Sequence, residues 1–123
     1  MSFCTVVNCM DGRVQEPVIN YLKDYYKVKY VDSVTEPGPN KILAEDQDSS
    51  YTKSIVERIN ISVGKHNSVG LAVVGHFGCA GNPVEYEEQL EHLEKSASFL
   101  KEQYEGMEVL KLWVDENWNV NKL

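Results

Sequence analysis

The sequence predicts an α/β fold in which a central, mainly parallel sheet of about four strands is flanked by helices. Short apolar segments rich in β-branched residues alternate along the chain with longer segments whose apolar residues recur every three or four positions. Strands that alternate with helices usually pair in parallel, because each helix carries the chain back to the same end of the sheet. The length of 123 residues suits one domain, so we expect residues 1–123 to form a single domain.

The first part of the chain contains two predicted strands and a helix between them. Residues 3–8 form a short apolar segment that predicts a buried strand ending at Cys9. The apolar residues that follow recur at helical spacing and predict a helix over residues 17–27. Alternating residues predict a second strand over residues 28–34, and the Pro and Gly residues of 36–40 are expected to break any regular element.

The rest of the chain continues this alternation. Three polar residues offer N-caps for a helix that Gly64 can terminate. Residues 69–74 are almost wholly apolar, as expected for a strand that is buried on both faces. The pair Asn82-Pro83 suits the start of a long helix that ends at Gly106. A strand over residues 107–114 then turns into a short hairpin strand at the C-terminus.

Composition limits the classes of partner and the cellular compartment. The net charge of −7 opposes the phosphate contacts on which nucleic-acid binding depends, so we expect no nucleic-acid partner. No apolar run is long enough to span a membrane, and no basic region leads an apolar stretch at the start of the chain. Three cysteines cannot all pair within the chain, so we expect a cytoplasmic protein whose thiols serve metal binding or catalysis.

Two predicted strand ends carry metal-ligating side chains. Cys9 ends the first strand, and His76 and Cys79 follow the third, where open α/β sheets bind their ligands if the two strands are neighbours. Two thiolates and one imidazole are typical zinc ligands, and a site with three protein ligands keeps a fourth position open for water, as catalytic zinc sites do. The alternative is that these cysteines only fill the core, as we expect for Cys4.

Two charged residues adjoin the first cysteine in the run Cys-x-Asp-x-Arg. In a turn Asp11 and Arg13 can reach each other, which keeps Asp11 ionised and able to accept a hydrogen bond from metal-bound water. The same pair could serve only as a structural ion pair that caps a loop. A nucleophilic cysteine of the phosphatase kind would need a longer anion-binding loop between Cys9 and Arg13.

Together these motifs resemble those of the β-class carbonic anhydrases, whose signature is Cys-x-Asp-x-Arg followed later by His-x-x-Cys. The resemblance covers most of the chain and implies that Cys9, His76 and Cys79 hold Zn²⁺, that Asp11 orients the zinc water, and that Arg13 holds Asp11. The implied reaction is the reversible hydration of carbon dioxide to bicarbonate by a zinc-bound hydroxide. The resemblance also points to a homodimer or higher homo-oligomer, as do the exposed edges expected of so small a sheet.

Two other functions remain open at this stage. Relatives of the family use the same ligands on other linear molecules, so the site could hydrolyse carbon disulfide or carbonyl sulfide. A non-catalytic zinc-binding domain is favoured by departures from the family pattern: Ala80-Gly81 follows Cys79 in place of Gly-Ala, and Glu36-Pro37 stands where the family usually has Arg-Asn-Ala. The family's N-terminal helical arm is also absent.

Several other residues have simpler interpretations. His92 and Glu88 have metal-ligand spacing, but the many glutamates around them favour a solvated helix face. His66 is expected in an exposed loop, with a distant proton-shuttle role as the alternative. The aromatic residues are expected in the core and in interfaces: Tyr25, Tyr26, Trp113 and Trp118.

Overall fold

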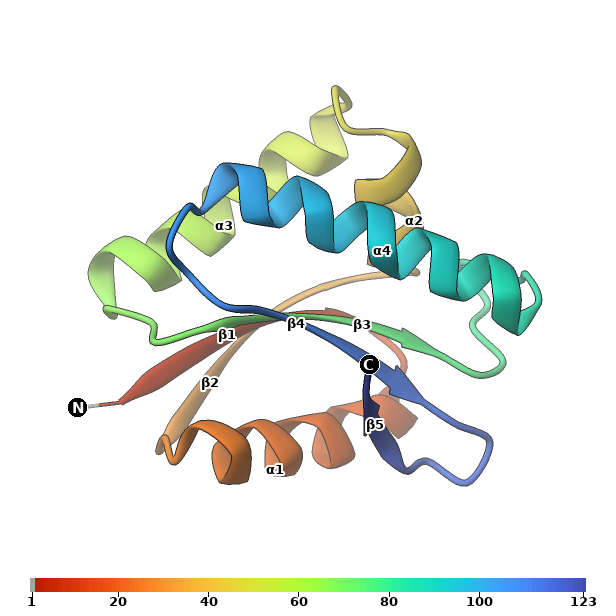
Figure 1. Cartoon of the computed structure of the whole chain (residues 1–123), viewed down its shortest axis with the longest axis horizontal. Helices are drawn as coiled ribbons and strands as arrows, with labels where there is room; N and C mark the ends of the chain where they lie inside the picture. The colour runs from red at the N-terminus through yellow and green to blue at the C-terminus, as the bar shows by residue number, and fades with distance from the viewer. Residues whose placement is uncertain (1) are drawn as a thin grey trace.

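A five-stranded sheet forms the centre of the molecule in the computed structural model, which describes residues 2–123 (Figure 1). Its strand order is β2-β1-β3-β4-β5, and all neighbours pair in parallel except the last two strands. The predicted α/β class with a mainly parallel sheet is confirmed, and the predicted C-terminal hairpin strand brings the sheet to five strands. The strands are β1 (Phe3–Cys9), β2 (Tyr30–Glu36), β3 (Leu71–His76), β4 (Val109–Val114) and β5 (Val120–Lys122).

Helices cover both faces of this sheet, as predicted. Helix α1 packs on one face together with the β4–β5 hairpin, while α2, α3 and α4 lie on the other (Figure 1). A short 3-10 turn, Gly12–Val14, joins β1 to α1. The helices are α1 (Gln15–Tyr26), α2 (Pro39–Glu45), α3 (Ser50–Lys65) and α4 (Tyr86–Gln103).

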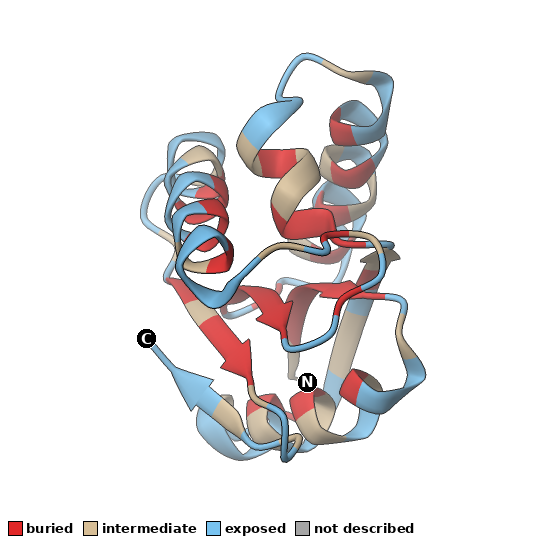
Figure 2. Cartoon of the chain, turned by 90° about the vertical axis from the view of Figure 1, so that its right-hand side faces the viewer, coloured by how far each residue is buried: buried red, intermediate tan, exposed pale blue. Residues whose placement is uncertain are grey.

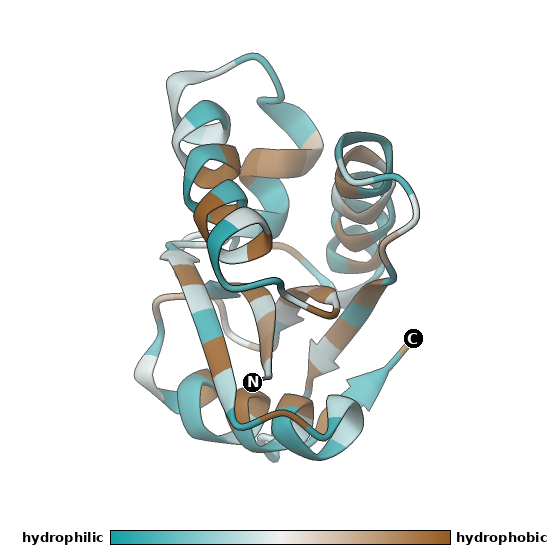
Figure 3. Ribbon diagram, turned by 90° about the vertical axis from the view of Figure 1, so that its left-hand side faces the viewer, coloured by the Kyte–Doolittle hydropathy of each residue, from teal (hydrophilic) through white to brown (hydrophobic). Residues whose placement is uncertain are grey.

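Apolar side chains form one cluster on each face of the sheet. Alternate residues of β1 point to opposite faces, so Val6 joins the cluster under α1 while Val7 joins the cluster under the other helices. Figure 2 shows that burial concentrates in the strands and on the inner sides of the helices, and Figure 3 shows apolar residues recurring along the same elements. Burial of these faces on both sides fixes β1 and β3 as the rigid centre of the molecule.

The strand order places the ends of β1 and β3 side by side. Thr5, Val6 and Val7 of β1 pair with Leu71, Ala72 and Val73 of β3. From β1 the chain crosses to β2 on one side of the sheet, and β3 lies on the other side of β1, so the crossover direction reverses between these two central strands. At such a reversal, the loops that follow the two strands run in opposite directions. The space between these loops can hold a ligand.

Three predictions of secondary structure were wrong in detail. The segment 36–40 does not break all structure, because Gly38 adopts a left-handed φ of 60° and Pro39 then starts α2. Helix α4 begins at Tyr86 and not at Pro83, since Asn82 binds neighbouring loop atoms instead of capping a helix. Gly64 lies inside α3, which ends at Lys65.

The buried face of α4 also differs from the prediction. His92, expected on a solvated face, is buried together with Gln89 and Ser96, beside the apolar residues Leu93 and Ala97. This helix can bury polar side chains because partners in neighbouring segments satisfy the polar groups of Gln89 and His92.

No helix within the described residues is long and apolar enough to cross a membrane.

Candidate metal centre

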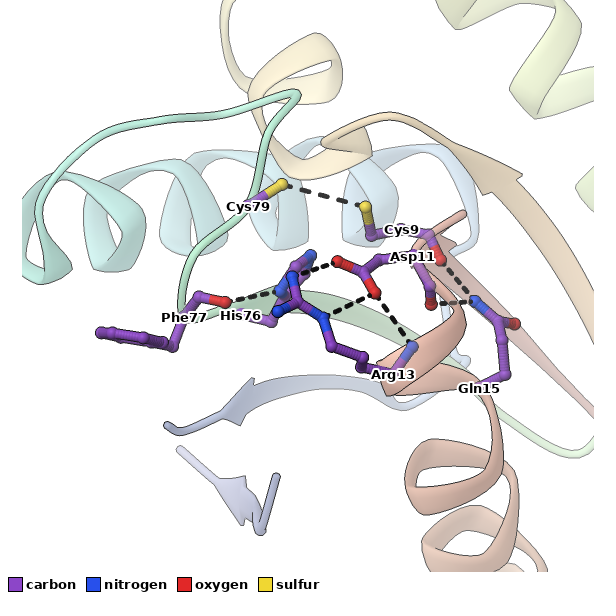
Figure 4. Close-up of polar contacts among 7 residues, drawn as sticks. All are labelled: Cys9, Asp11, Arg13, Gln15, His76, Phe77 and Cys79. Carbon is purple, nitrogen blue, oxygen red and sulfur yellow. Dashed lines mark hydrogen bonds and ion pairs between the residues drawn. The ribbon is translucent and has the colours of Figure 1, made fainter. Parts of the chain in front are cut away.

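The structure brings Cys9, His76 and Cys79 together at the carboxyl ends of β1 and β3 (Figure 4). One ligand atom of each residue lies within 4.8 Å of the others, and all three residues are buried. Cys9 and His76 are the last residues of their strands, while Cys79 returns toward them after Gly78 adopts a left-handed φ of 67°. Glycine suits this position because other residues adopt that conformation only with strain.

The sulfur spacing fits a tetrahedral metal ion. The Sγ atoms of Cys9 and Cys79 lie 3.8 Å apart. Two sulfurs bound at about 2.3 Å to one tetrahedral ion are separated by about 3.8 Å. The thiols therefore already have the separation that Zn²⁺ requires.

The imidazole of His76 presents a free nitrogen to the same point. Its Nδ1 lies 2.9 Å from the carbonyl oxygen of Phe77, and since a carbonyl oxygen can only accept, Nδ1 carries the proton. Nε2 is buried and has no hydrogen-bond partner among the described residues. The lone pair on Nε2 is therefore buried with no donor to bind, which is the arrangement expected of a metal ligand. The hydrogen bond from Nδ1 holds the ring in the orientation that a metal ligand needs.

The two thiols shift each other's pKa in opposite directions. The hydrogen bond from the Cys79 thiol lowers the pKa of Cys9, and this outweighs burial, which raises it. The same contact raises the pKa of Cys79, because a second thiolate beside the first is unfavourable. Burial lowers the pKa of His76, but the Cys9 sulfur, the Phe77 carbonyl and Asp11 raise it overall. A cation between the sulfurs would stabilise both as thiolates, which the pair alone does not.

Asp11 and Arg13 form a tight pair beside the cysteines, but Asp11 is not one of the three clustered ligands. Oδ1 accepts from the backbone N–H of Arg13 at 2.9 Å and from Nε at 3.1 Å, and Oδ2 accepts from Nη2 at 2.7 Å (Figure 4). These bonds from Arg13 lower the pKa of Asp11 to about 2. The carboxylate is therefore ionised at any pH near neutrality and is held by the arginine.

Two residues that the sequence did not single out for the site hold this loop in place. The side-chain amide of Gln15 donates to the carbonyl oxygens of Cys9 at 2.7 Å and Asp11 at 2.9 Å. The guanidinium of Arg13 lies 4.5 Å from the ring centre of Trp118, which comes from the β4–β5 hairpin. Nothing in the sequence predicts that Gln15 binds the carbonyls of this loop or that Trp118 lies against Arg13, because both contacts depend on the folded chain.

The loops that follow β2 and β3 pack against each other behind the cysteines. A Cβ atom on Gly81 would lie 2.4 Å from the carbonyl carbon of Pro37, and one on Gly38 would lie 2.8 Å from that of Gly81. Asn82, fully buried, donates its backbone N–H to the Cys79 carbonyl, and its own carbonyl accepts from Gln89 of α4. Only glycines allow this approach, so they fix the position of the Cys79 loop.

A pocket of about 490 Å³ opens beside the metal-ligating group. Its lining includes His76, the apolar residues Phe77, Val84 and Trp113, and the acidic residues Glu85 and Glu116. The ring of Phe77 points away from the two sulfurs (Figure 4), and half of this residue is exposed to solvent. The pocket can thus admit a small molecule to the edge of the site.

The remaining residues noted in the sequence lie away from the site. Cys4 is fully buried in the cluster under α1, as predicted. His66 caps the C-terminus of α3, where its ring stacks on Phe3 and its Nδ1 lies 2.6 Å from Asp32. Trp113 lies in the core under α2, α3 and α4, and Tyr26 and Trp118 pack against the cluster under α1, as predicted, whereas Tyr25 is exposed.

Comparisons with known proteins identify a family and a fold. The model of the family described as "Putative carbonic anhydrase" matches residues 1–123. One of two tetrameric β-carbonic anhydrases from the filamentous ascomycete Sordaria macrospora has a TM-score of 0.63 at 12% identity, covering 97% of this chain and 79% of that chain. The β-carbonic anhydrase CafA of the fungal pathogen Aspergillus fumigatus has a TM-score of 0.54 at 14% identity, covering 97% and 74%. No curated protein matches the sequence.

Proposed function

Because the chain belongs to the carbonic anhydrase-like family whose model it matches throughout, we propose that it catalyses the reversible hydration of carbon dioxide to bicarbonate. The catalytic ion is Zn²⁺, held by Cys9, His76 and Cys79. The observation that carries this proposal is the ligand geometry: two sulfurs 3.8 Å apart, an imidazole nitrogen of His76 within 4.8 Å of both, and an Nε2 atom that is buried without a hydrogen-bond partner among the described residues. Zinc supplies Lewis acidity, which makes water a nucleophile near neutral pH.

Asp11 positions the attacking water in this proposal. Oδ1 of Asp11 accepts two hydrogen bonds from Arg13, and Oδ2 accepts one. The second lone pair of Oδ2 is therefore available to accept a hydrogen bond from water. The same bonds hold Asp11 away from the thiols, so the carboxylate does not become a ligand. Trp118 and Gln15 keep Arg13 and the loop in that position.

The pocket beside His76 favours a neutral substrate. Phe77, Val84 and Trp113 give it apolar walls that suit an uncharged linear molecule. Glu85 and Glu116 also line the pocket, and their negative charge repels a product anion, so they favour release of bicarbonate. Carbonyl sulfide and carbon disulfide are also neutral and linear, and the assay below separates them.

The assembly and the compartment follow the same proposal. The fungal relative from Sordaria macrospora is described as tetrameric, so a homo-oligomer, most simply a symmetric dimer, is proposed for this chain. The three cysteines are all free, which suits a reducing compartment such as the cytoplasm.

Zinc analysis combined with a carbon dioxide hydration assay tests the proposal. We expect about one tightly held zinc per chain from this site and measurable hydration, with both lost in Cys79→Ser. Cys4→Ala is the matched control, because Cys4 is a buried thiol outside the site and its removal should preserve zinc and activity.

Three outcomes would contradict this proposal in different ways. A zinc content in a Cys9→Ser, Cys79→Ser double variant equal to that of the parent would place the ligands elsewhere. Zinc-loaded protein that hydrolyses carbonyl sulfide or carbon disulfide but leaves carbon dioxide unchanged would overturn the substrate. Zinc-loaded protein without turnover of any of the three would indicate a non-catalytic zinc-binding domain.

A further inference from the structure

A second group of metal-ligating side chains lies where the end of α2 meets α4, and we infer that it binds a divalent cation distinct from the ion at the cysteines. The group consists of Glu45, Glu88 and His92, with one ligand atom of each within 4.8 Å of the others. Glu45 is the last residue of α2, whereas Glu88 and His92 are four residues apart on α4. This spacing puts both side chains on one face of the helix, as in helical metal sites.

The geometry forms a cup with nitrogen at its base and oxygens at its rim. Nε2 of His92 lies 3.4 Å from Oε2 of Glu45 and 3.8 Å from Oε2 of Glu88. The His92 side chain is only 4% exposed, while those of Glu45 and Glu88 are 45% and 52% exposed. An ion can therefore enter from solvent past the carboxylates and reach the buried imidazole.

The two carboxylates gain from a cation at this point. Each lies near the other, and Glu45 also lies at the C-terminus of α2, where the helix dipole disfavours negative charge. The buried His92 faces both carboxylates, and its distances to their oxygens exceed the roughly 2.8 Å of a charge-assisted hydrogen bond. A bound cation would neutralise both carboxylates and use the Nε2 atom that no hydrogen bond within residues 2–123 engages.

Asn82 provides the group that orients His92. Its Nδ2 lies 2.9 Å from Nδ1 of His92, and its Oδ1 is buried without a hydrogen-bond partner among the described residues. A half-turn of the amide exchanges these two atoms and places Oδ1 where it accepts from Nδ1–H, which leaves the Nε2 lone pair for the ion. The exchange gives up the 3.4 Å contact from Nδ2 to Oδ1 of Asn40 and moves Nδ2 to the buried position where Oδ1 has no partner among the described residues, so the gain at His92 must offset these two costs.

The donor set selects a different cation chemistry from that of the thiolate centre. The group offers one imidazole and two carboxylates but no sulfur ligand. Such a set suits a borderline divalent ion such as Zn²⁺ or Co²⁺, with water as the remaining ligand. The two groups are connected through Asn82, which contacts both the Cys79 carbonyl and His92. The cation would therefore tie α2 and α4 together behind the loop that carries Cys79.

Titration of the protein with Co²⁺ tests this inference, because thiolate-bound Co²⁺ shows sulfur-to-metal charge-transfer absorption and oxygen- or nitrogen-bound Co²⁺ does not. We expect two equivalents per chain in the parent protein. Glu88→Gln and Glu45→Gln should each weaken binding of the second equivalent at least tenfold and leave the charge-transfer absorption intact, which also shows that the variants fold. Glu87→Gln, an exposed neighbour outside the group, is the matched control and should keep both equivalents.

The test distinguishes the two proposed metal sites from each other. Cys79→Ser should lose the charge-transfer absorption and keep the second equivalent, whatever the outcome of the hydration assay. A parent protein that binds only one equivalent, or a second equivalent that Glu45→Gln and Glu88→Gln leave unchanged, would overturn the inference and leave His92 as an ion-pair partner of the two glutamates. Equal weakening by Glu87→Gln would overturn it as well.

Discussion

At the scale of single residues, the pair formed by Asp11 and Arg13 separates metal binding from turnover. Arg13→Ala removes both side-chain hydrogen bonds to the carboxylate. We expect the freed Asp11 to move onto the metal as a fourth ligand, so hydration activity should fall by at least a hundredfold while zinc content stays near that of the parent. Metal analysis and initial rates on the same preparation measure both quantities.

Arg58→Ala is the matched control for this variant. Arg58 of α3 pairs with Glu36 of β2, so its removal also breaks an arginine–carboxylate pair, but one that does not involve Asp11. Its activity should remain within about twofold of the parent. An Arg13→Ala protein as active as the parent from pH 7 to 9 would show that Asp11 needs no partner to stay off the metal.

The pKa of Asp11 gives the pH dependence of the same pair. In the folded protein Arg13 lowers it from 3.8 to about 2, so the folded state binds fewer protons than the unfolded state between these values. The resulting stabilisation is fully present above about pH 4 and is lost as the pH falls through 2. We expect NMR titration of the Asp11 carboxyl carbon in the metal-free protein to give about 2 in the parent and a value near 3.8 in Arg13→Ala. An unchanged value in the variant would mean that Arg13 does not set this pKa.

At the scale of elements, the contact between the two glycine loops fixes the Cys79 loop against the start of α2. Gly81→Ala places a methyl group 2.4 Å from the Pro37 backbone, so the loops must separate. We expect a loss of about 1–3 kcal/mol in unfolding free energy, as in other overpacked sites, together with weaker zinc retention. Urea unfolding and metal analysis measure these effects.

Gly64→Ala is the control for that substitution. Nothing lies within 4 Å of a Cβ at Gly64, which is inside α3, so alanine should stabilise the helix by up to about 1 kcal/mol. Destabilisation of similar size in both variants would show that the close approach of Gly81 to Pro37 has no special cost.

Local sequence patterns predicted the elements well and failed where tertiary contacts decide. The apolar strand over residues 69–74 and the fold class depend on periodicity, which is visible in the sequence. Helix α2 was missed because a proline can either break an element or start a helix. Here Pro39 starts a helix, since Gly38 before it adopts a left-handed conformation that the sequence does not reveal. The contacts of Gln15 and Asn82, and the burial of His92, depend on how the loops fold back on the neighbouring elements. The residue pattern therefore does not predict them, even though Gln15 and its partners, and Asn82 and His92, are at most 10 positions apart.

At the scale of the whole molecule, the sheet has an open edge. Strand β2 is the outer strand on its side, and among the described residues only β1 pairs with it, while Tyr30 and Ser33 are exposed. Met10 and Phe77, which directly follow β1 and β3, are exposed apolar residues near the metal-ligating group. Unpaired edges and exposed apolar surface both favour association, so we expect an assembly of at least two chains. Light scattering at micromolar concentration measures the mass, and a single-chain mass would contradict the expectation.

The central place of β1 in the sheet bears on the order of events during folding. The sulfurs of Cys9 and Cys79 are separated by 70 positions in the chain and meet only when β1 has paired with β3. A ribosome delivers the first cysteine long before its partners, and closing a loop of this length is slow compared with forming the helices within it. The complete set of three ligands therefore arises late, and in refolding experiments the capture of metal should follow strand pairing and not precede it.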